Sequence, residues 1–216
     1  MGDMQDLLNP EKALIFRIVH RDNLRWLLEN GLHCRNSDRT DPNFVSIGNL
    51  DLISSRHSHP VSVPPGGSLS DYVPFYFTPL SVMLFNINTG YHGIRQRRNE
   101  EIVILVSSLH KLQEDNIHFI FTDRHARLAS ARVFTDISDM NQIDWKILQN
   151  RDFRRDIDDL EKIERYQAEA LVHRRLPINS LLGVACYNTS ECDKANKLAD
   201  GAGLSLRIVS RPGWYF

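Results

Sequence analysis

The sequence predicts an α+β fold, in a single domain that spans residues 1–216. Strand-like and helix-like segments are mixed along the chain without the regular βαβ alternation of a doubly wound sheet. No G-x-G-x-x-G motif follows a strand, which argues against a dinucleotide-binding fold of the Rossmann type. Of the 216 residues, 42% are apolar, and a chain of this size and composition can bury a sizeable core.

The first predicted elements are a strand and a helix. Residues 13–19 are rich in β-branched and aromatic side chains, which is typical of a buried strand. A helix is expected over residues 24–29, with Asp22 or Asn23 as its cap and Gly31 as its stop. The chain therefore opens with a strand that leads directly into a helix.

A long irregular segment follows, over residues 34–71. It contains four of the nine prolines, and a segment of this length without regular structure is usually functional or mobile. Tyr72 then leads into a predicted strand over residues 73–77, and residues 81–86 predict a short helix.

The second half of the chain supplies most of the predicted sheet. Strands are expected over residues 101–106, 119–122, 168–172, 183–187 and 204–209. Helices are expected over residues 144–150 and 192–199. Between the first of these helices and the strand at 168–172, the segment 151–165 is highly charged.

Composition and charge narrow the classes of function. The net charge is −1, so contact with a nucleic acid must come from a local patch of basic residues. Three scattered cysteines do not form a disulfide framework and fit a reducing cytoplasm. The N-terminus is acidic and carries no signal-peptide pattern, and no run approaches about 20 apolar residues. A cytoplasmic protein without a membrane span is expected.

The familiar catalytic motifs do not occur. The sequence has no P-loop, no H-E-x-x-H, no C-x-x-C and no G-x-S-x-G motif. His57 and His59 come nearest to a metal-binding pair, but no carboxylate or cysteine at ligand spacing accompanies them. No metal site is expected.

Two charged residues lie inside strand-like runs. Glu169 has small neighbours, and its placement fits either an exposed charge at a strand edge or a catalytic carboxylate. Arg17 lies between two apolar residues, so it either extends to water or meets a partner in a polar cleft. Tyr76 and Phe77 lie on opposite faces of their strand, and one of them is expected to line a pocket.

Arginine clusters are the candidates for contact with phosphates. One cluster consists of Arg95, Arg97 and Arg98, and another consists of Arg174 and Arg175. Each fits a phosphate-binding surface or a solvated face, and the residues alone leave both interpretations open.

Several short motifs occur in a specific order and spacing. They are FRIVHRDNL at 16–24, SIG at 46–48 with Arg56 ten residues after Ser46, DYVPFYFTP at 71–79, ML at 83–84, FTDRH at 121–125 and QAE at 167–169. In this order, and from about residue 12 to Trp214 and Tyr215, the chain resembles the DarT family of DNA ADP-ribosyltransferase toxins. It most resembles their thymidine-modifying branch.

The resemblance implies an ADP-ribosyltransferase fold, in which a split, twisted β core forms a cleft for NAD⁺ and is flanked by helices. Glu169 matches the catalytic glutamate, and Arg56 matches the arginine that cooperates with it. The positions that match residues around NAD⁺ are Arg17, Ile18, Val19, His20, Tyr76 and Met83. Some relatives carry histidine at the position of Arg17. The implied partners are single-stranded DNA, NAD⁺ as substrate, and a macrodomain antitoxin, DarG, that removes the modification.

The chemistry of ADP-ribose transfer fits these residue types. Cleavage of the nicotinamide–ribose bond develops positive charge on the ribose, which the Glu169 carboxylate can stabilise. Arg56 can stabilise the anion of the acceptor, expected to be thymine N3, and Tyr76 can stack on nicotinamide. The segment 127–165, which precedes Glu169, occupies the place where this fold class carries its substrate-recognition loop. Its residues Arg151, Arg154 and Arg155 are candidates for contact with DNA phosphates.

Three other functions compete with DNA modification. An NAD⁺ glycohydrolase would use the same Glu169 with water as the acceptor. A transferase that modifies another base or a protein would also share this site. A catalytically silent nucleic-acid-binding module is a third possibility, which an intact Glu169 and Arg56 argue against.

Overall fold

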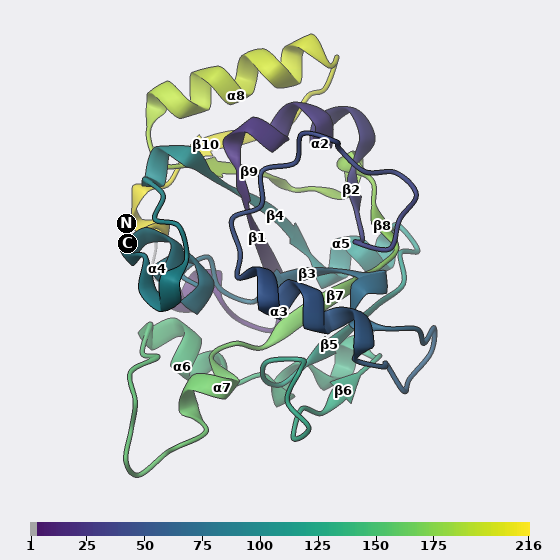
Figure 1. The fold of residues 1–216 in the computed structure, drawn as a ribbon, viewed down its shortest axis with the longest axis vertical. Coiled ribbons are helices and arrows are strands. Elements are labelled where there is room, and N and C mark those ends of the chain that lie inside the picture. Colours follow the sequence, from purple (N-terminus) through teal and green to yellow (C-terminus); the bar gives the residue numbers. More distant parts are fainter. Residues whose placement is uncertain (1–3) are drawn as a thin grey trace.

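A computed structural model describes residues 4–216, which build one eight-stranded sheet with helices packed around it (Figure 1). The strand order is β10-β9-β4-β1-β3-β7-β5-β6. Neighbouring strands are antiparallel except β9 and β10, which are parallel. This arrangement confirms the predicted α+β class. The first three residues of the acidic N-terminus lie outside the described part of the chain.

The strands and helices follow one another along the whole described chain. The strands are β1 (Leu14–His20), β2 (Leu32–His33), β3 (Tyr72–Tyr76), β4 (Ile102–Ser108), β5 (Phe119–Thr122), β6 (Val133–Phe134), β7 (Glu169–His173), β8 (Arg175–Leu176), β9 (Gly183–Cys186) and β10 (Ile208–Ser210). The α-helices are α1 (Met4–Leu7), α2 (Leu24–Asn30), α3 (Leu50–Ser55), α4 (Val82–Thr89), α5 (Leu109–Glu114), α6 (Trp145–Asn150), α7 (Lys162–Arg165) and α8 (Thr189–Gly201). Strands β2 and β8 pair with each other outside the main sheet.

Helix α2 ends as predicted at Gly31, where φ is +81°, but it does not begin as predicted. Neither Asp22 nor Asn23 caps it with its side chain. Instead, His20 Nδ1 accepts a hydrogen bond from the Asp22 N–H at a short 3₁₀ turn before the helix. The Asn23 amide makes two hydrogen bonds with the backbone of Val45, so it holds the following irregular segment in place.

The segment over residues 34–71 is not irregular throughout, which corrects the expectation. It contains helix α3, whose first turn is capped by Asn49: the side-chain oxygen accepts hydrogen bonds from the backbone N–H groups of Asp51 and Leu52. The last predicted strand is also shorter than expected, because β10 begins at Ile208.

The sheet is divided between β1 and β3. Strand β1 has seven register pairs with β4, but among the described residues it pairs with β3 at one position, Phe16 opposite Tyr76. Beyond this pair, residues 17–20 leave the β3 side of their backbone without a strand partner. The split core that the resemblance implied is therefore present, and it places an open edge in the middle of the sheet.

Alternation along β3 separates the core from a second face. Val73, Phe75 and, just beyond the strand, Phe77 are fully buried in the main apolar core. Tyr72 belongs to a smaller cluster with Leu171 of β7 on the other face. Tyr76 shares the face of Tyr72, because residues four apart on a strand point the same way. This face carries the candidate site.

Candidate active site

Glu169 and Arg56 lie together, although 113 residues separate them in the sequence. Arg56 Nη1 donates a hydrogen bond to Glu169 Oε2 at 2.9 Å, and the side chains are only 13% and 2% exposed. Glu169 is the first residue of β7, and Arg56 directly follows α3. The backbone N–H of Ala126 donates to the other carboxylate oxygen at 3.2 Å. The two residues predicted to be catalytic thus form one buried ion pair.

The surroundings of Glu169 favour its charged form. Burial alone would raise the pKa of this carboxyl, but the Arg56 guanidinium and the Ala126 N–H outweigh the burial and lower the pKa below its ordinary value. The carboxylate is therefore ionised at neutral pH, and it is already oriented by hydrogen bonds on both oxygens.

Sequence reasoning gave no role to His125, which lies beside the pair. His125 Nδ1 is 3.4 Å from Glu169 Oε1, and the same nitrogen accepts a hydrogen bond from the Arg127 N–H at 3.2 Å. Burial lowers the pKa of His125, so the ring is neutral at pH 7 and its proton lies on Nε2. Its motif, FTDRH, was the available signal, but the contact with Glu169 depends on the pairing of β5 with β7.

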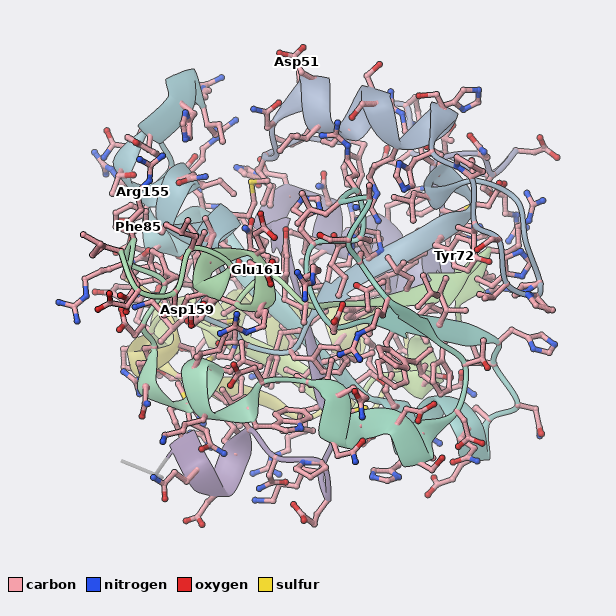
Figure 2. All side chains as sticks on the ribbon, turned by 90° about the horizontal axis from the view of Figure 1, so that it is seen from below. Asp51, Tyr72, Phe85, Arg155, Asp159 and Glu161 are labelled. Atoms are coloured by element: carbon pink, nitrogen blue, oxygen red, sulfur yellow. The ribbon has the colours of Figure 1, made fainter. Side chains whose placement is uncertain are left out.

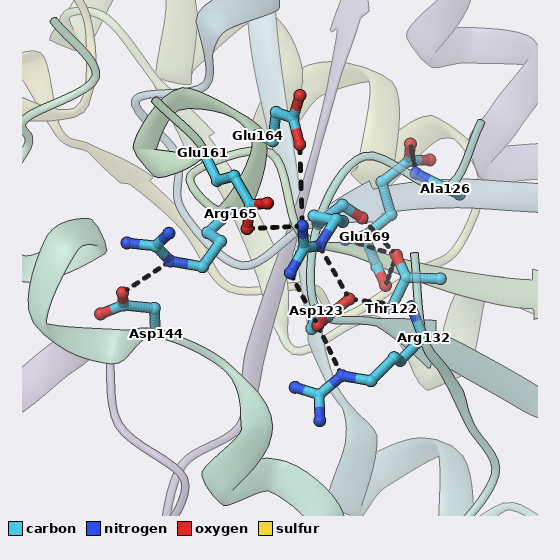
Figure 3. A network of polar contacts seen from close by, with 10 residues as sticks. Thr122, Asp123, Ala126, Arg132, Asp144, Glu161, Glu164, Arg165 and Glu169 are labelled. Carbon is cyan, nitrogen blue, oxygen red and sulfur yellow. Dashed lines mark hydrogen bonds and ion pairs between the residues drawn. The ribbon is translucent and has the colours of Figure 1, made fainter. Parts of the chain in front are cut away.

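A network of polar contacts holds the backbone around Glu169, as Figure 3 shows. Thr122 Oγ1 donates to the Arg124 carbonyl at 2.7 Å and accepts from the Glu169 N–H at 3.3 Å. The Arg124 guanidinium bonds Glu161 at 3.0 Å and contacts Asp123 at 3.4 Å. These bonds join the loop after β5 to α7 and to the first residue of β7, so the position of the carboxylate is fixed from three sides.

Tyr76 lies directly opposite Glu169 in the β3–β7 register. Side chains at such positions are neighbours, with Cβ atoms about 4.5–5.5 Å apart. Burial, with the nearby Glu169 charge, raises the pKa of the Tyr76 phenol, so the ring is neutral at physiological pH. An uncharged aromatic surface therefore adjoins the Glu169 carboxylate.

A cavity of about 530 Å³ opens beside the ion pair, under the segment that carries α3. Arg17, Val19 and Arg56 line it, together with aromatic side chains such as Trp26 and Phe44. Its size is in the range of small-molecule and cofactor sites. Aromatic walls and arginine side chains suit a ligand with bases and phosphates.

The cavity has two arginines close enough to influence each other. Burial and the charge of Arg56 lower the pKa of Arg17 to about 10, which still leaves its guanidinium charged at pH 7. Arg17 Nη1 donates to the Pro74 carbonyl at 2.7 Å. Arg56 Nη2 is buried and has no hydrogen-bond partner among residues 4–216. A buried unpaired donor is costly, so this group is suited to bind a ligand atom.

The other candidate NAD⁺ residues do not line this cavity. The His20 ring is buried elsewhere, with Nδ1 bonded to the Asp22 N–H and Nε2 3.5 Å from Glu101 Oε1. Ile18 and His20 can therefore reach a ligand in the cleft only through the open backbone edge of β1. Met83 is half-buried on α4, against the core.

Arg154 and Arg155 are exposed on the segment between α6 and α7. The Arg154 side chain is 88% exposed and pairs with Asp152 at 3.1 Å. The structure thus brings Arg17, Val19, Arg56, Tyr76 and Glu169 to one cleft region, and it leaves the two candidate DNA arginines on the surface.

Within residues 4–216, no group of three or more His, Cys, Asp or Glu side chains is arranged to hold a metal ion. In the same range, none of the helices combines the length and apolar character that crossing a membrane requires.

Comparisons with known proteins agree with this geometry. Residues 16–216 match the family model described as "ssDNA thymidine ADP-ribosyltransferase, DarT". The chain is 51% identical, over 99% of its length and 98% of the relative, to a DNA ADP-ribosyl transferase of Escherichia coli O127:H6.

Two solved structures of DarT from Thermus sp. 2.9 share the fold at 33% identity. The complex with ADP-ribosylated ssDNA gives a TM-score of 0.88 and the complex with NAD⁺ gives 0.82. Each match covers 96% of this chain and at least 98% of the other. The chain belongs to the DarT family of DNA ADP-ribosyltransferases.

Proposed function

We propose that the protein transfers ADP-ribose from NAD⁺ to N3 of a thymine in single-stranded DNA and releases nicotinamide. The observation that carries this proposal is the buried Glu169–Arg56 pair beside a cavity with two arginines. Membership of the DarT family supports the same reaction. The solved structures of DarT from Thermus sp. 2.9 contain NAD⁺ or ADP-ribosylated ssDNA, which are the substrate and a product of this kind of reaction.

Glu169 stabilises the transition state for cleavage of the bond between ribose C1 and nicotinamide. Its ionised carboxylate accepts a hydrogen bond from the ribose 2′-hydroxyl and faces the positive charge that develops on the sugar. The Ala126 N–H and Arg56 orient this carboxylate before the substrate arrives, so little reorganisation is needed during the reaction.

Arg56 acts on the acceptor base. The new bond joins C1 to thymine N3, and N3 must lose its proton to the solvent. Arg56 stabilises the resulting base anion, and its Nη2, which has no hydrogen-bond partner among residues 4–216, supports this role. Proton removal by Arg56 itself is the weaker alternative, because a guanidinium remains charged to a pH above about 12.

The remaining residues bind the substrates. NAD⁺ is held by Arg17 and Val19 in the cavity, by the backbone of Ile18 and His20, and by Tyr76 and Met83 near nicotinamide. Arg154 and Arg155 contact DNA phosphates.

As part of this proposal, the protein is a single-domain cytoplasmic toxin that a DarG macrodomain antitoxin counteracts. The main core supports one domain, since it contains residues from Met4 to Tyr215. Three free, buried cysteines fit a reducing compartment.

The decisive experiment is mass spectrometry of oligonucleotides incubated with NAD⁺. A single-stranded oligonucleotide with one thymine should gain one ADP-ribose, and the same oligonucleotide with N3-methylthymine should gain none. Glu169→Gln should reduce the rate at least about a hundredfold, since loss of one preorganised charge contact of this kind costs about 2.7 kcal/mol or more.

The alternatives give different products in the same assay. Free ADP-ribose formed equally fast with and without DNA identifies an NAD⁺ glycohydrolase. Labelling of N3-methylthymine or of a thymine-free oligonucleotide contradicts the proposed acceptor. Glu169→Gln with wild-type turnover and an unchanged melting temperature contradicts the proposed catalytic residue.

A further inference from the structure

Residues 90–98, which follow helix α4, form an exposed loop with positive charge. They contain Arg95, Arg97 and Arg98 and no Asp or Glu, in a chain whose net charge is −1. Tyr91 is 57% exposed, which is unusual for a large aromatic side chain, and its ring lies 4.1 Å from the ring of His92. We call residues 90–98 the basic loop.

Arg95 and Arg98 differ in their contacts from Arg97, the third arginine of the basic loop. Arg97 pairs with Glu101 at 3.0 Å and is largely buried. Arg95 and Arg98 are exposed, and neither forms an ion pair within residues 4–216. By contrast, residues 151–161 contain three arginines with four aspartates and one glutamate, so that segment is acidic overall.

The basic loop is held in a defined shape by hydrogen bonds to α4. Gln96 Nε2 donates to the Asn88 carbonyl at 2.7 Å, and the Arg97 N–H donates to the Ile87 carbonyl at 3.0 Å. His92 has a φ of +57°, a left-handed conformation that turns the chain. Because the loop is already ordered, binding of a ligand loses little conformational entropy.

Helix α4, which precedes the basic loop, follows the strand that carries Tyr76, and the far end of the loop contacts Glu101 through Arg97. Strand β3 runs from Tyr72, in the cavity wall, to Tyr76, opposite Glu169, and the chain then continues into α4. The Tyr166 hydroxyl bonds the Leu80 carbonyl at 3.0 Å, which ties the start of α4 to the approach to β7. Helix α4 has eight residues and is therefore about 12 Å long.

Phe85 of α4 and Tyr72 of β3 lie toward opposite sides of the molecule (Figure 2), with Arg155 on the side of Phe85. Phe85 also packs against Phe153, with 5.5 Å between the ring centroids, so α4 contacts the beginning of the 151–161 segment. A single strand whose reacting base reached Glu169 could extend along this side of the protein.

We propose that the basic loop is a subsite for single-stranded DNA that flanks the modified base. Tyr91 stacks on an unpaired base, and Arg95 and Arg98 contact backbone phosphates, which is the combination that binds single strands without reading their sequence. This inference rests on the proposed DNA acceptor. In this proposal the basic loop makes most of the electrostatic contacts with the DNA next to the modified base, and Arg154 and Arg155 make fewer of them.

The test compares oligonucleotides of increasing length around one target thymine, from about 4 to about 16 nucleotides, the range of single-strand site sizes. In Tyr91→Ala, KM for the longest oligonucleotide should rise roughly tenfold or more, while KM for the shortest and KM for NAD⁺ stay unchanged. In Arg95→Ala/Arg98→Ala, the slope of log affinity against log salt should fall by about 1.4 for the longest oligonucleotide. Tyr91→Phe should retain stacking and behave as wild type.

A charge-matched control separates local contact from a change in net charge. Lys197→Ala/Arg207→Ala removes two exposed positive charges on α8 and beside β10 and should leave the length dependence unchanged. Equal losses on short and long oligonucleotides, or none on either, would overturn the subsite. The same losses in the control pair would also overturn it. Failure of wild-type protein to label any oligonucleotide would instead reject the proposed function.

Discussion

Glu169 remains ionised in a buried position because Arg56 and the Ala126 N–H oppose the cost of burial. At the scale of single residues, the family resemblance predicted Glu169 and Arg56 as a pair, whereas the residues alone left the role of Glu169 open. His125 was missed because its importance comes from its distance to Glu169, which depends on strand pairing. The orientation of the His20 ring could not be predicted either, because the sequence does not show that Glu101 lies beside it.

The pKa values of the site predict the acid limb of the pH–rate profile. The pKa of Glu169 is lowered from 4.5 and that of His125 from 6.5, so at pH 6.5 Glu169 is ionised and His125 is mostly neutral. The transfer rate at saturating substrates should therefore stay level from pH 7 to about 6.5 and decline only at lower pH.

The lowered pKa of Glu169 also makes the stability of the fold depend on pH. The depressed Glu169 pKa gives stability that is present above its unfolded value of 4.5 and is lost as the pH falls through the folded value. Melting temperatures recorded beside the rates distinguish unfolding from titration of the site. A half-maximal rate at pH 6.5 or above, with the fold intact, would be inconsistent with these pKa directions.

Arg56→Ala should impair DNA modification more than NAD⁺ binding. In the proposed mechanism Arg56 stabilises the acceptor base, and Arg17, which also lines the cavity, remains to attract the cofactor phosphates. Affinity for NAD⁺ is measured by calorimetry, and transfer by single-turnover kinetics. Arg17→Ala serves as the opposite case, with a larger effect on NAD⁺ affinity. If Arg56→Ala weakened both properties equally, Arg56 would be a cofactor ligand with no separate role toward the base.

At the scale of elements, short helix α3 determines where Arg56 lies. Long apolar strands such as β4 were predictable because composition alone favours them. Helix α3 was not predicted, since none of its six residues is buried and three are exposed, which gives no clear periodic signal. The two-residue strands β2, β6 and β8 exist only through their partners, so local sequence cannot reveal them.

Asn49→Ala should lower the transfer rate through α3. The Asn49 side chain caps this helix with two hydrogen bonds, and loss of such a cap costs about 1 kcal/mol. Because Arg56 directly follows α3, fraying of the helix should displace its guanidinium and reduce the rate severalfold, with Asn49→Ser close to wild type. Ser108→Ala removes the cap of α5 and should lower the melting temperature similarly without affecting the rate. Equal rate losses in both variants would show that general destabilisation is responsible.

At the scale of the whole molecule, charge and topology together favour an accessible, unpaired substrate. The net charge of −1 is unlike that of proteins that hold duplex DNA through many phosphate contacts. The fold class could be predicted from the mixture of elements. The division of the sheet came only from the family resemblance, because the number of pairs between β1 and β3 is a tertiary property.

A thymine in single-stranded DNA should be modified much faster than the same thymine in a duplex. Thymine N3 takes part in base pairing, so duplex substrate must first be unpaired at a cost of a few kcal/mol. One labelled oligonucleotide is assayed alone and annealed to its complement, with a duplex that places the thymine in an internal bulge as the control. The bulged thymine should regain most of the rate. Equal labelling of the single strand and the perfect duplex would contradict an acceptor atom on the pairing edge.

The open edge of β1 also has a consequence for self-association. Unpaired strand edges recruit strands from other chains, and native proteins usually protect them. Here the edge lies inside the sheet, and the segment that carries Phe44 and α3 covers the cavity beside it. That segment therefore has a second task besides forming the cavity: it shields an aggregation-prone edge. Shortening this segment should therefore lower the solubility of the protein even where the reaction itself is unaffected.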